Sequence, residues 1–439
     1  MAPNKADTRA VVVGAGITGL SAALLLARKD IQVQVLETES VPGGLLAPVN
    51  FEGFELDRGS HRVHPESHPL LVELTREAEW QSQLRAGCLL LNGRQLSYPL
   101  DPIRFVAGLG VKTTASMAFG WLRRPDALKQ TLNWESDRKE VGDDEGFEDF
   151  IVRRVGESAY RQFYEPYARK VWGIEPKDLS QTVAKQRVST SNPAQSILRK
   201  TEKRFLYPKE GMASLIQLLR KKVEEAGGEV QLGSSFDVQS TNGAPVFYTG
   251  HLGDLTETST LNHRGLYLLY VSLPEHAIGE TDTWYVPESH YWFGRVSQPA
   301  RFSDALSRPG ERTLCIEIPE GTWGPDEDFV RQSATLMSQL TDAGIVQRKT
   351  EPLRVSQVFL PRVYPMYTRG WVKEQRRVLK EAASKQSIYP CGRQGLFLHC
   401  NMDQAVATAS AAVEHWSSGG DALSWVDKCR EFADFRVRD

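Results

Sequence analysis

Three glycines and one glutamate near the N-terminus have the spacing of a dinucleotide-binding turn. Gly14, Gly16 and Gly19 form a GxGxxG pattern between a β-branched run and a Leu/Ala-rich segment with helical spacing. In such a turn the first glycine permits a tight bend, the second lets the backbone approach a pyrophosphate, and the third lets helix and strand pack closely. Glu37 follows after about 20 residues, where its carboxylate can bind ribose hydroxyls and disfavours NADP. The pattern predicts an adenine dinucleotide at a helix N-terminus; the alternative is a glycine turn without a ligand.

A second glycine pair, Gly43-Gly44, follows shortly after Glu37 and precedes Leu45. Two adjacent glycines permit close approach of the backbone to a ligand that already lies along the first turn. The pair therefore indicates a longer cofactor, although on spacing alone it could be an ordinary turn.

Several segments resemble one family of flavoproteins. The run ETESVPGGLLAPVNFEGFELDRGSHRVH is similar to the early region of the FAD enzymes that include amine oxidases, protoporphyrinogen oxidases and UDP-galactopyranose mutases. The segments KVWGIEPKDLS, YPKEGM, VYPMY and GRQGLFLHCNMDQA resemble the mutases and the bacterial protoporphyrinogen oxidase-like proteins within that group. The resemblance implies FAD rather than NAD, and it covers most of the chain.

The resemblance also implies which residues hold the cofactor. In the family, the helix that follows Asn401 directs its N-terminus at the pyrimidine end of the flavin, where backbone N–H groups stabilise negative charge. Asn401 has the side chain of an N-cap residue. The residues expected to contact FAD are Gly14, Gly16, Ile17, Thr18, Gly19, Glu37, Gly43, Gly44, Leu45, Gly59, Ser60, His61, Gly392, Arg393, Asn401, Met402, Asp403 and Gln404.

His61 is expected near flavin N5, because the mutases carry a Gly-x-His segment followed by a second histidine, which here matches His64. From the residues alone, two histidines with this spacing are also compatible with a metal site. No cluster of Cys, Asp or Glu completes such a site, so we expect no metal.

A second set of residues is expected to bind substrate, again by resemblance. Tyr167 and Trp172 match cleft-lining aromatic residues, although packing in a core is the alternative for both. Arg187 and Arg295 resemble the arginines with which the mutases bind a diphosphate, a task that suits the planar guanidinium. Tyr364 matches a phosphate-binding or flavin-facing tyrosine better than Tyr367 does. His61, Arg187, Arg295 and Tyr364 are thus the expected catalytic residues.

One departure from the mutases concerns substrate choice. Just before the final helix the mutases carry a tyrosine that holds a phosphate, and His399-Cys400 stand there in this chain. We therefore expect an FAD-dependent oxidoreductase, an oxidase or dehydrogenase that acts on a small organic intermediate by hydride transfer to flavin N5. The alternatives are a redox-neutral nucleotide-sugar mutase that uses reduced FAD, and a non-catalytic flavin-bound scaffold.

These residues require a scaffold of the α/β class. Arg9–Val13 and Ile31–Leu36 are expected as parallel strands around the helix Ile17–Ala27, which makes one βαβ unit. We expect a Rossmann-type FAD-binding domain with a helical insertion and a mixed-sheet substrate domain, α+β overall. The expected ranges are 1–95, 203–240 and 352–439 for the FAD-binding domain, 96–202 for the helical insertion and 241–351 for the substrate domain.

Composition limits the partners. The chain of 439 residues has a formal net charge of −2 and no basic stripe, which argues against nucleic acid as a partner. Five scattered cysteines without a CxxC pair and a polar N-terminus suit a cytoplasmic protein with a small-molecule substrate. The stretch Phe105–Leu122 is too interrupted to span a membrane, although contact with a membrane surface is an alternative for it. The sequence says nothing of oligomeric state.

Overall fold

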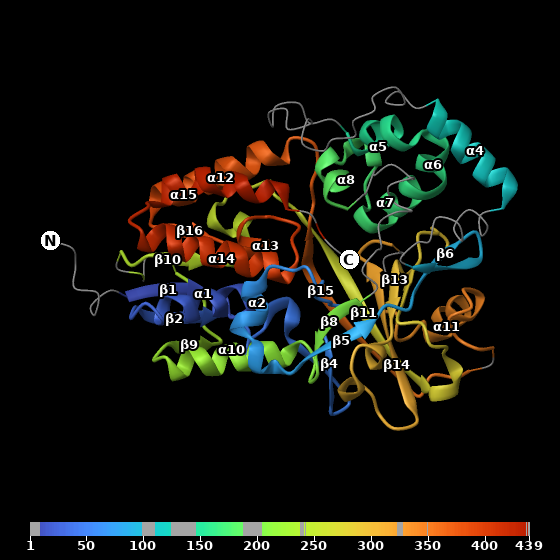
Figure 1. The fold of residues 1–439 in the computed structure, drawn as a ribbon, viewed down its shortest axis with the longest axis horizontal. Helices are drawn as coiled ribbons and strands as arrows, with labels where there is room; N and C mark the ends of the chain where they lie inside the picture. The colour runs from blue at the N-terminus through green and yellow to red at the C-terminus, as the bar shows by residue number, and fades with distance from the viewer. Residues whose placement is uncertain are drawn as a thin grey trace. The chain divides into compact units, whose positions relative to one another are not determined.

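The computed structural model describes residues 9–98, 110–123, 146–187, 204–237, 241, 243–322, 328–348, 350–435 and 437. The described residues form two compact units, each made of separate stretches of chain (Figure 1). The first unit lies within Met1–Ser82, Leu206–Asn262 and Trp371–Asp439. The second lies within Gln83–Phe205 and His263–Gly370.

A parallel five-stranded sheet forms the centre of the first unit. Its strand order is β16-β10-β1-β2-β9. The bounds are β1 (Arg9–Val13), β2 (Gln32–Glu37), β9 (Glu229–Leu232), β10 (Val246–Tyr248) and β16 (Ile388–Pro390). The apolar run of β1 is buried from its second residue onward, as expected for a central strand of a parallel sheet covered on both faces. The expected βαβ unit is thus present, with each strand within one residue of its predicted bounds.

Helices α1 (Ile17–Ala27), α10 (Ala213–Glu225) and α14 (Met402–Ser417) run side by side along this sheet (Figure 1). Helix α1 is rich in alanine and leucine, so it can be buried along most of its length against its two neighbours. The remaining elements of this unit are η2 (Gly44–Leu46), β3 (Pro48–Phe51), β4 (Phe54–Asp57), α2 (Pro69–Leu74), η3 (Arg76–Ala78), η7 (Leu252–Leu255), α12 (Trp371–Lys385), α13 (Gly392–Gly395), α15 (Ala422–Lys428) and η11 (Cys429–Asp434).

A mixed seven-stranded sheet forms the centre of the second unit. Its order is β15-β11-β14-β13-β12-β6-β7, and all neighbours are antiparallel except β12 and β6. The bounds are β6 (Gly87–Leu91), β7 (Arg94–Tyr98), β11 (His263–Pro274), β12 (Thr283–Tyr285), β13 (Arg295–Ser297), β14 (Glu311–Pro319) and β15 (Arg354–Pro365). An apolar core that includes Leu269, Trp284, Phe293 and Ile316 holds α11 (Ser333–Asp342) against this sheet.

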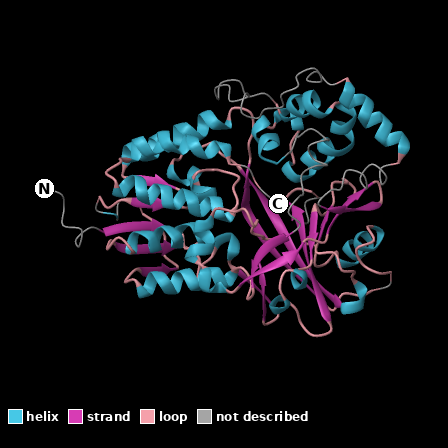
Figure 2. Cartoon of the chain, in the orientation of Figure 1, coloured by secondary structure: helices cyan, strands magenta, loops and turns pink. Residues whose placement is uncertain are grey.

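Figure 2 shows both helices (cyan) and strands (magenta) in the described part of the chain. The helices of the inserted segment belong to the second unit. Helix α7 (Glu165–Trp172) has Pro166 in its first turn, where the missing N–H costs nothing, and ends at Gly173 with φ +66°. The other elements are α4 (Val111–Leu122), α5 (Phe147–Val155), α6 (Glu157–Ala159), η4 (Tyr160–Tyr164), η5 (Pro176–Asp178), α8 (Gln181–Arg187), η8 (Glu275–Ala277), η9 (Pro299–Arg301) and η10 (Asp304–Leu306). Strands β5 (Trp80–Leu84) and β8 (Arg204–Pro208) contain two of the four points where the chain passes from one unit to the other.

The unit boundaries differ from the expected domain ranges in three places. Residues 83–95 supply β6 and the start of β7 of the mixed sheet, and β15 extends that sheet with residues 354–365, so neither stretch belongs to the unit with the glycine turn. Conversely, residues 241–262 belong to the first unit, where β10 is a central parallel strand. The reason is physical, because a short apolar run predicts a strand but carries no information about which sheet it joins.

Within the described ranges, no helix is long and apolar enough to cross a membrane. The described residues also contain no group of three or more His, Cys, Asp or Glu side chains that could hold a metal ion.

Candidate functional site

The glycine turn between β1 and α1 shows which of its glycines the protein itself requires. Gly14 has φ +98° and its N–H donates to the Leu36 carbonyl at 2.8 Å. A Cβ on Gly19 would overlap the carbonyl oxygen of Gly14, so α1 and β1 are too close for a larger residue. Gly16 is different, because its φ is −79° and a Cβ there would meet nothing nearer than the Gly43 carbonyl oxygen at 3.7 Å. The fold therefore demands glycine at positions 14 and 19 but not at 16.

The carboxylate of Glu37 closes this turn. Glu37 ends β2, is 8% exposed, and accepts hydrogen bonds from the N–H groups of Ala15 at 2.8 Å and Glu39 at 3.0 Å. The hydroxyl of Thr38 donates to the same carboxylate at 3.3 Å. Because a carboxylate offers about four acceptor positions, room remains for a hydroxyl of a bound molecule.

The second glycine pair lies directly beside the first turn. Gly16 and Gly43 form an isolated parallel bridge, and the Gly43 N–H donates to the Ala15 carbonyl at 3.0 Å. Gly43 and Gly44 have φ +130° and +56°, both in the region that favours glycine. Two backbone turns distant in sequence thus face one another, as a long nucleotide cofactor would require.

His61 and Arg58 hold the second turn in place. The ring Nε2 of His61 lies 2.8 Å from the Arg58 carbonyl oxygen and 3.1 Å from that of Leu45, so it carries the proton and donates it. The Arg58 guanidinium donates to the Gly44 carbonyl at 3.0 Å. Between them, Gly59 has φ +90° and Ser60 is partly exposed. His61 therefore has a structural task that the sequence did not indicate.

The N-terminus of α14 is closed by a capping box. The Asn401 side chain accepts from the backbone of the third helical residue, and Gln404 accepts from the Asn401 N–H at 2.9 Å. This confirms Asn401 as the N-cap residue. The Asp403 carboxylate accepts from the His68 N–H at 2.8 Å. The side chains of Asp403 and Gln404 therefore form hydrogen bonds within the protein. A ligand at this end of α14 would bind to the backbone of the first turn, from Met402 onward.

Helix α13 packs against the N-terminal part of α1, where Gly392 lies beside Thr18. Gly392 has φ +76°, and a Cβ there would come within 2.7 Å of the Thr18 side chain. The Gly392 N–H donates to the Thr408 hydroxyl of α14 at 2.8 Å. Arg393 follows, with Nη2 3.4 Å from His399 Nδ1. All the predicted cofactor residues, Ile17 included, thus belong to the first unit.

A buried carboxylate that the sequence did not single out lies at the end of β4. Asp57 accepts hydrogen bonds from the Met212 N–H at 2.8 Å and from the Tyr207 hydroxyl. Burial raises the pKa of Asp57 to about 7, although the Met212 and Ala213 backbone N–H groups act in the opposite direction. Asp57 joins the segment of Gly59 and His61 to the YPKEGM segment. The only sequence signal for Asp57 was its place in the run ELDRGSH, because Tyr207 and Met212 lie far from it in the sequence.

Because the pKa of Asp57 is raised, we expect the stability of the protein to depend on pH. The unfolded chain loses this proton near the ordinary value of 3.8, whereas the folded chain keeps it up to about pH 7. The free energy of unfolding should therefore fall by about 2–4 kcal/mol between pH 4 and pH 8 through this group. We expect the variant Asp57→Asn to lose this part of the pH dependence in urea unfolding, while Glu414→Gln, on an exposed acid, keeps it. Equal pH dependence in wild type and Asp57→Asn would contradict the assignment.

In the second unit, Arg295 lies between two cross-strand neighbours. Its register partners are Tyr285 on β12 and Glu317 on β14. Its Nε and Nη2 donate to Glu317 Oε1 at 2.9 and 2.7 Å, and the Glu317 side chain is 5% exposed. Burial alone would lower the pKa of Arg295, but Glu317, Tyr364 and Tyr285 together raise it well above its ordinary value. Arg295 is therefore a permanently charged group whose guanidinium is already oriented by a buried carboxylate.

The predicted substrate residues gather only in part. The rings of Trp172 and Tyr364 meet edge to face with centroids 6.0 Å apart. Tyr364 is also one of the groups that raise the pKa of Arg295. The ring of Tyr167 stacks on that of Phe163, with the ring centroids 6.3 Å apart. Trp172 is 2% exposed, so core packing accounts for much of the environment of Trp172. Arg187 ends α8, and its side chain lies outside the described part of the structure.

Tyr367 is fully buried, and its carbonyl accepts from the Ser180 N–H at 2.8 Å, a packing role. Tyr364 is therefore the tyrosine of this segment that remains a candidate for substrate binding.

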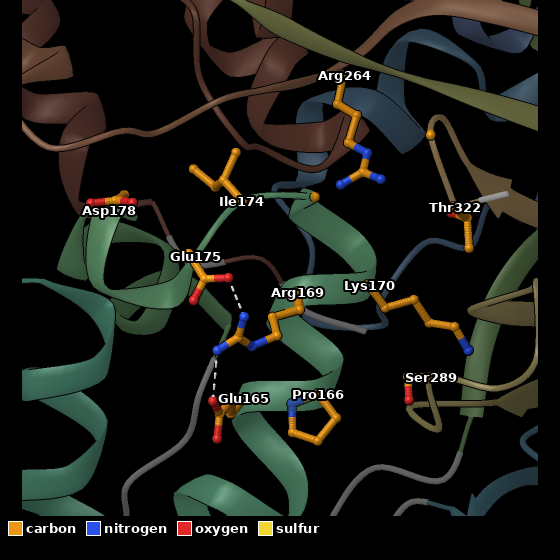
Figure 3. Close-up of a pocket in the computed structure, with 12 residues that line it drawn as sticks. Glu165, Pro166, Arg169, Lys170, Ile174, Glu175, Asp178, Arg264, Ser289 and Thr322 are labelled. Atoms are coloured by element: carbon orange, nitrogen blue, oxygen red, sulfur yellow. Dashed lines mark hydrogen bonds and ion pairs between the residues drawn. The ribbon is translucent and has the colours of Figure 1, made fainter. Parts of the chain in front are cut away.

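A cavity of about 790 Å³ opens beside α7 in the second unit (Figure 3). Arg169 forms one wall and makes ion pairs with Glu165 at 2.9 Å and with Glu175. Lys170 and Arg264 reach it from other sides, and Arg264 donates through Nε to the Glu320 carbonyl at 3.0 Å. A Cβ on Gly173 would overlap the Arg264 guanidinium, which thus packs on the C-terminal end of α7. No local sequence pattern indicated Lys170 or Arg264, because their partners are distant along the chain.

Comparison with known proteins identifies the family. Residues 17–237, just over half of the chain, match the model of the flavin containing amine oxidoreductase family. A protoporphyrinogen oxidase 2 of Arabidopsis thaliana is 26% identical over 180 residues, which are 39% of this chain and 34% of that protein. A dTDP-fucopyranose mutase of Escherichia coli is 23% identical over 181 residues, 40% of this chain and 45% of that protein. The matched region thus spans less than half of these relatives.

Among solved structures, reduced UDP-galactopyranose mutase is similar in fold along nearly the whole chain. The TM-score is 0.79 at 17% identity, and the match covers 98% of this chain and all of the other. This confirms the α/β fold with a Rossmann-type domain. Proteins of the matched family bind FAD, as the resemblance implied, and they include oxidoreductases. The chain therefore belongs to the flavin-containing amine oxidoreductase family and is an FAD-binding flavoprotein.

Proposed function

We propose that this chain is an FAD-dependent oxidoreductase that removes a hydride from a small organic biosynthetic intermediate. The observation that carries this choice over a mutase is the environment of His399 and Cys400. These residues occupy the place where the mutases, by resemblance, hold a substrate phosphate with a tyrosine, yet they are 1% and 4% exposed. His399 lies against Arg393. A buried imidazole and thiol offer no phosphate-binding hydroxyl to a nucleotide sugar.

The residues of the first unit fit FAD. Gly16 is the clearest case, because no contact among the described residues requires glycine there, whereas a pyrophosphate against this backbone would. Glu37 keeps acceptor capacity beside the turn, as a ribose hydroxyl needs. We therefore infer that the N-terminus of α1 holds the pyrophosphate and Glu37 holds the adenosine ribose.

The remaining cofactor residues would hold the flavin end. The first turn of α14, capped by Asn401, presents N–H groups that favour negative charge on the pyrimidine side. His61 would act as a positioning residue, since its Nε2–H fixes the Leu45 carbonyl of the second turn. When bound, the flavin supplies the redox chemistry by accepting a hydride at N5.

In the second unit we assign substrate orientation to Arg295, Tyr364 and Trp172. Arg295 directs one edge of its guanidinium at Glu317, which leaves the Nη1 edge as the part that can bind an anionic or carbonyl group of the substrate. Tyr364 can donate its hydroxyl to the same group, and the Trp172 ring buttresses it. Tyr167 and Arg187 remain candidates by resemblance.

A redox-neutral mutase is the second candidate, favoured by the association of Arg295 with Tyr364 and by the fold shared with UDP-galactopyranose mutase. The two are separated by photoreducing the purified holoprotein and adding UDP-galactopyranose under anaerobic conditions. If the protein is an oxidoreductase, the sugar ring of UDP-galactopyranose should stay unchanged. Ring contraction without net oxidation of the flavin would refute it.

Aerobic turnover separates catalysis from the third alternative, a flavin-bound scaffold. We expect oxygen or dye reduction with at least one reduced carbon substrate from a panel of coproporphyrinogen III, protoporphyrinogen IX and primary amines. A holoprotein whose flavin cycles with no member of the panel would support the scaffold.

A further inference from the structure

Lys170 is a buried lysine that stands in the middle of α7. Its residue exposure is 6%, and its ammonium donates to three backbone carbonyls. The acceptors are Val286 at 2.9 Å, Glu288 at 2.5 Å and Phe293 at 2.7 Å. An ammonium has three N–H donors, so these three bonds use its full capacity. In Figure 3 the side chain extends from α7 toward the segment that carries Ser289.

The three carbonyls belong to one connection, residues 286–294, between β12 and β13. Phe293 and Val286 at its ends are fully buried in the core of the second unit. Arg295, the first residue of β13, directly follows this connection. Lys170 thus ties the helix of Tyr167 and Trp172 to the backbone that leads into Arg295.

Burial lowers the pKa of Lys170 to about 7, while Glu288 acts in the opposite direction. A buried cation with backbone acceptors in place of a carboxylate is costly to maintain. An apolar contact would join α7 to the connection at a lower cost in free energy. The use of three directed hydrogen bonds instead indicates that the position of α7 relative to the connection must be fixed.

We propose that Lys170 is a positioning residue, which sets the placement of the Tyr167 and Trp172 side chains of α7 relative to Arg295. This inference rests on the proposed function, because it concerns the residues assigned there to the substrate. Arg264 supports the same arrangement by packing on Gly173 at the C-terminal end of the helix.

The neighbouring residue Arg169 provides a matched control. It is on the same helix and has the same charge, but its side chain is 46% exposed and its partners are Glu165 and Glu175. Exposed ion pairs of this kind contribute little. Arg169→Met therefore removes a charge from α7 without touching the connection.

The experiment compares wild-type holoprotein with Lys170→Met, Lys170→Arg and Arg169→Met by hydrogen–deuterium exchange. We expect Lys170→Met to raise exchange at least about tenfold in peptides covering 163–173 and 286–296, while α11 and α14 keep their wild-type rates. Arg169→Met should leave all four regions unchanged, and Lys170→Arg, which keeps donors, should be intermediate. Unchanged exchange in both segments, or an equal rise throughout the second unit, would overturn the proposal.

Kinetics with the panel substrate that the wild type oxidises give the second readout. We expect Lys170→Met to raise KM about ten- to a hundredfold with kcat changed much less, because the displaced side chains would bind the substrate more weakly in the ground state and the transition state alike. Equal losses in Lys170→Met and Arg169→Met would overturn the positioning role. If the wild type oxidises no panel compound, the proposed function fails, and the exchange data still decide whether Lys170 fixes α7 to the connection.

Discussion

Replacing Gly16 with alanine is expected to weaken FAD binding strongly while leaving the first unit folded. Within the described part of the chain, the nearest atom that the added Cβ meets is the Gly43 carbonyl oxygen at 3.7 Å, so the apoprotein loses little more than the small preference for glycine at a helix N-cap. A pyrophosphate that lies against this backbone would meet the new methyl group directly. We expect at least about a tenfold drop in FAD affinity, which corresponds to about 1.4 kcal/mol or more.

The measurement is the flavin absorbance of the purified variant, with circular dichroism and thermal unfolding of the apoprotein as tests of folding. Gly279→Ala is the control, because Gly279 has an ordinary φ and a Cβ added there would have no atom within 4 Å. Gly19→Ala should fail differently, by disrupting the packing of α1 on β1. Full FAD content in Gly16→Ala would show that the pyrophosphate does not lie at this turn.

Replacing Arg295 with methionine is expected to destabilise the second unit strongly. The variant removes the ion-pair partner of Glu317, whose side chain is 5% exposed, and the loss of one member of such a pair costs about 3–5 kcal/mol. The double variant Arg295→Met/Glu317→Met should recover most of this loss, because a buried pair can be replaced by apolar residues of similar volume. Urea unfolding of both variants measures the difference.

The same pair of variants separates stability from substrate binding. If Arg295 orients the substrate, the double variant folds but has a KM raised about a hundredfold. Arg312→Met is the control, since its partner Glu275 is 52% exposed and is not left buried without a counter-charge, so the loss should be less than about 1 kcal/mol. If the double variant folds and keeps the wild-type KM, Arg295 contributes to stability only and does not bind the substrate.

The parts of the fold that local sequence determines were predictable. The strand Arg9–Val13, the glycine turn and helix Ile17–Ala27 follow from residue types that are close together in the chain, and all three are confirmed. The same holds for the helix after Asn401, whose capping box lies within four residues. Local propensity and hydrogen bonding within one turn suffice for such elements.

The residues that were missed act through distant partners. Lys170 donates to carbonyls more than a hundred positions away, and Asp57 pairs with Tyr207 across a similar separation. Arg295 was expected by resemblance to bind substrate, but its ion pair with Glu317 was not predicted, because Glu317 becomes its neighbour only through the pairing of β13 with β14. The expected domain ranges differ from the observed units at the residues of β6, β10 and β15 for the same reason. Strand pairing over long sequence separations is not encoded in any single segment.

Reduction of the bound FAD by a carbon substrate is the central step of the proposed function. It is tested most directly by anaerobic titration of the oxidised holoprotein with the porphyrinogen and amine panel, followed by the flavin absorbance. We predict that one class of compound bleaches the oxidised flavin band, with two electrons lost by the substrate for each flavin reduced. Gly16→Ala, to the extent that it is purified without FAD, should form correspondingly less product. An oxidised band that persists with every compound, together with conversion of UDP-galactopyranose by the reduced protein, would contradict it.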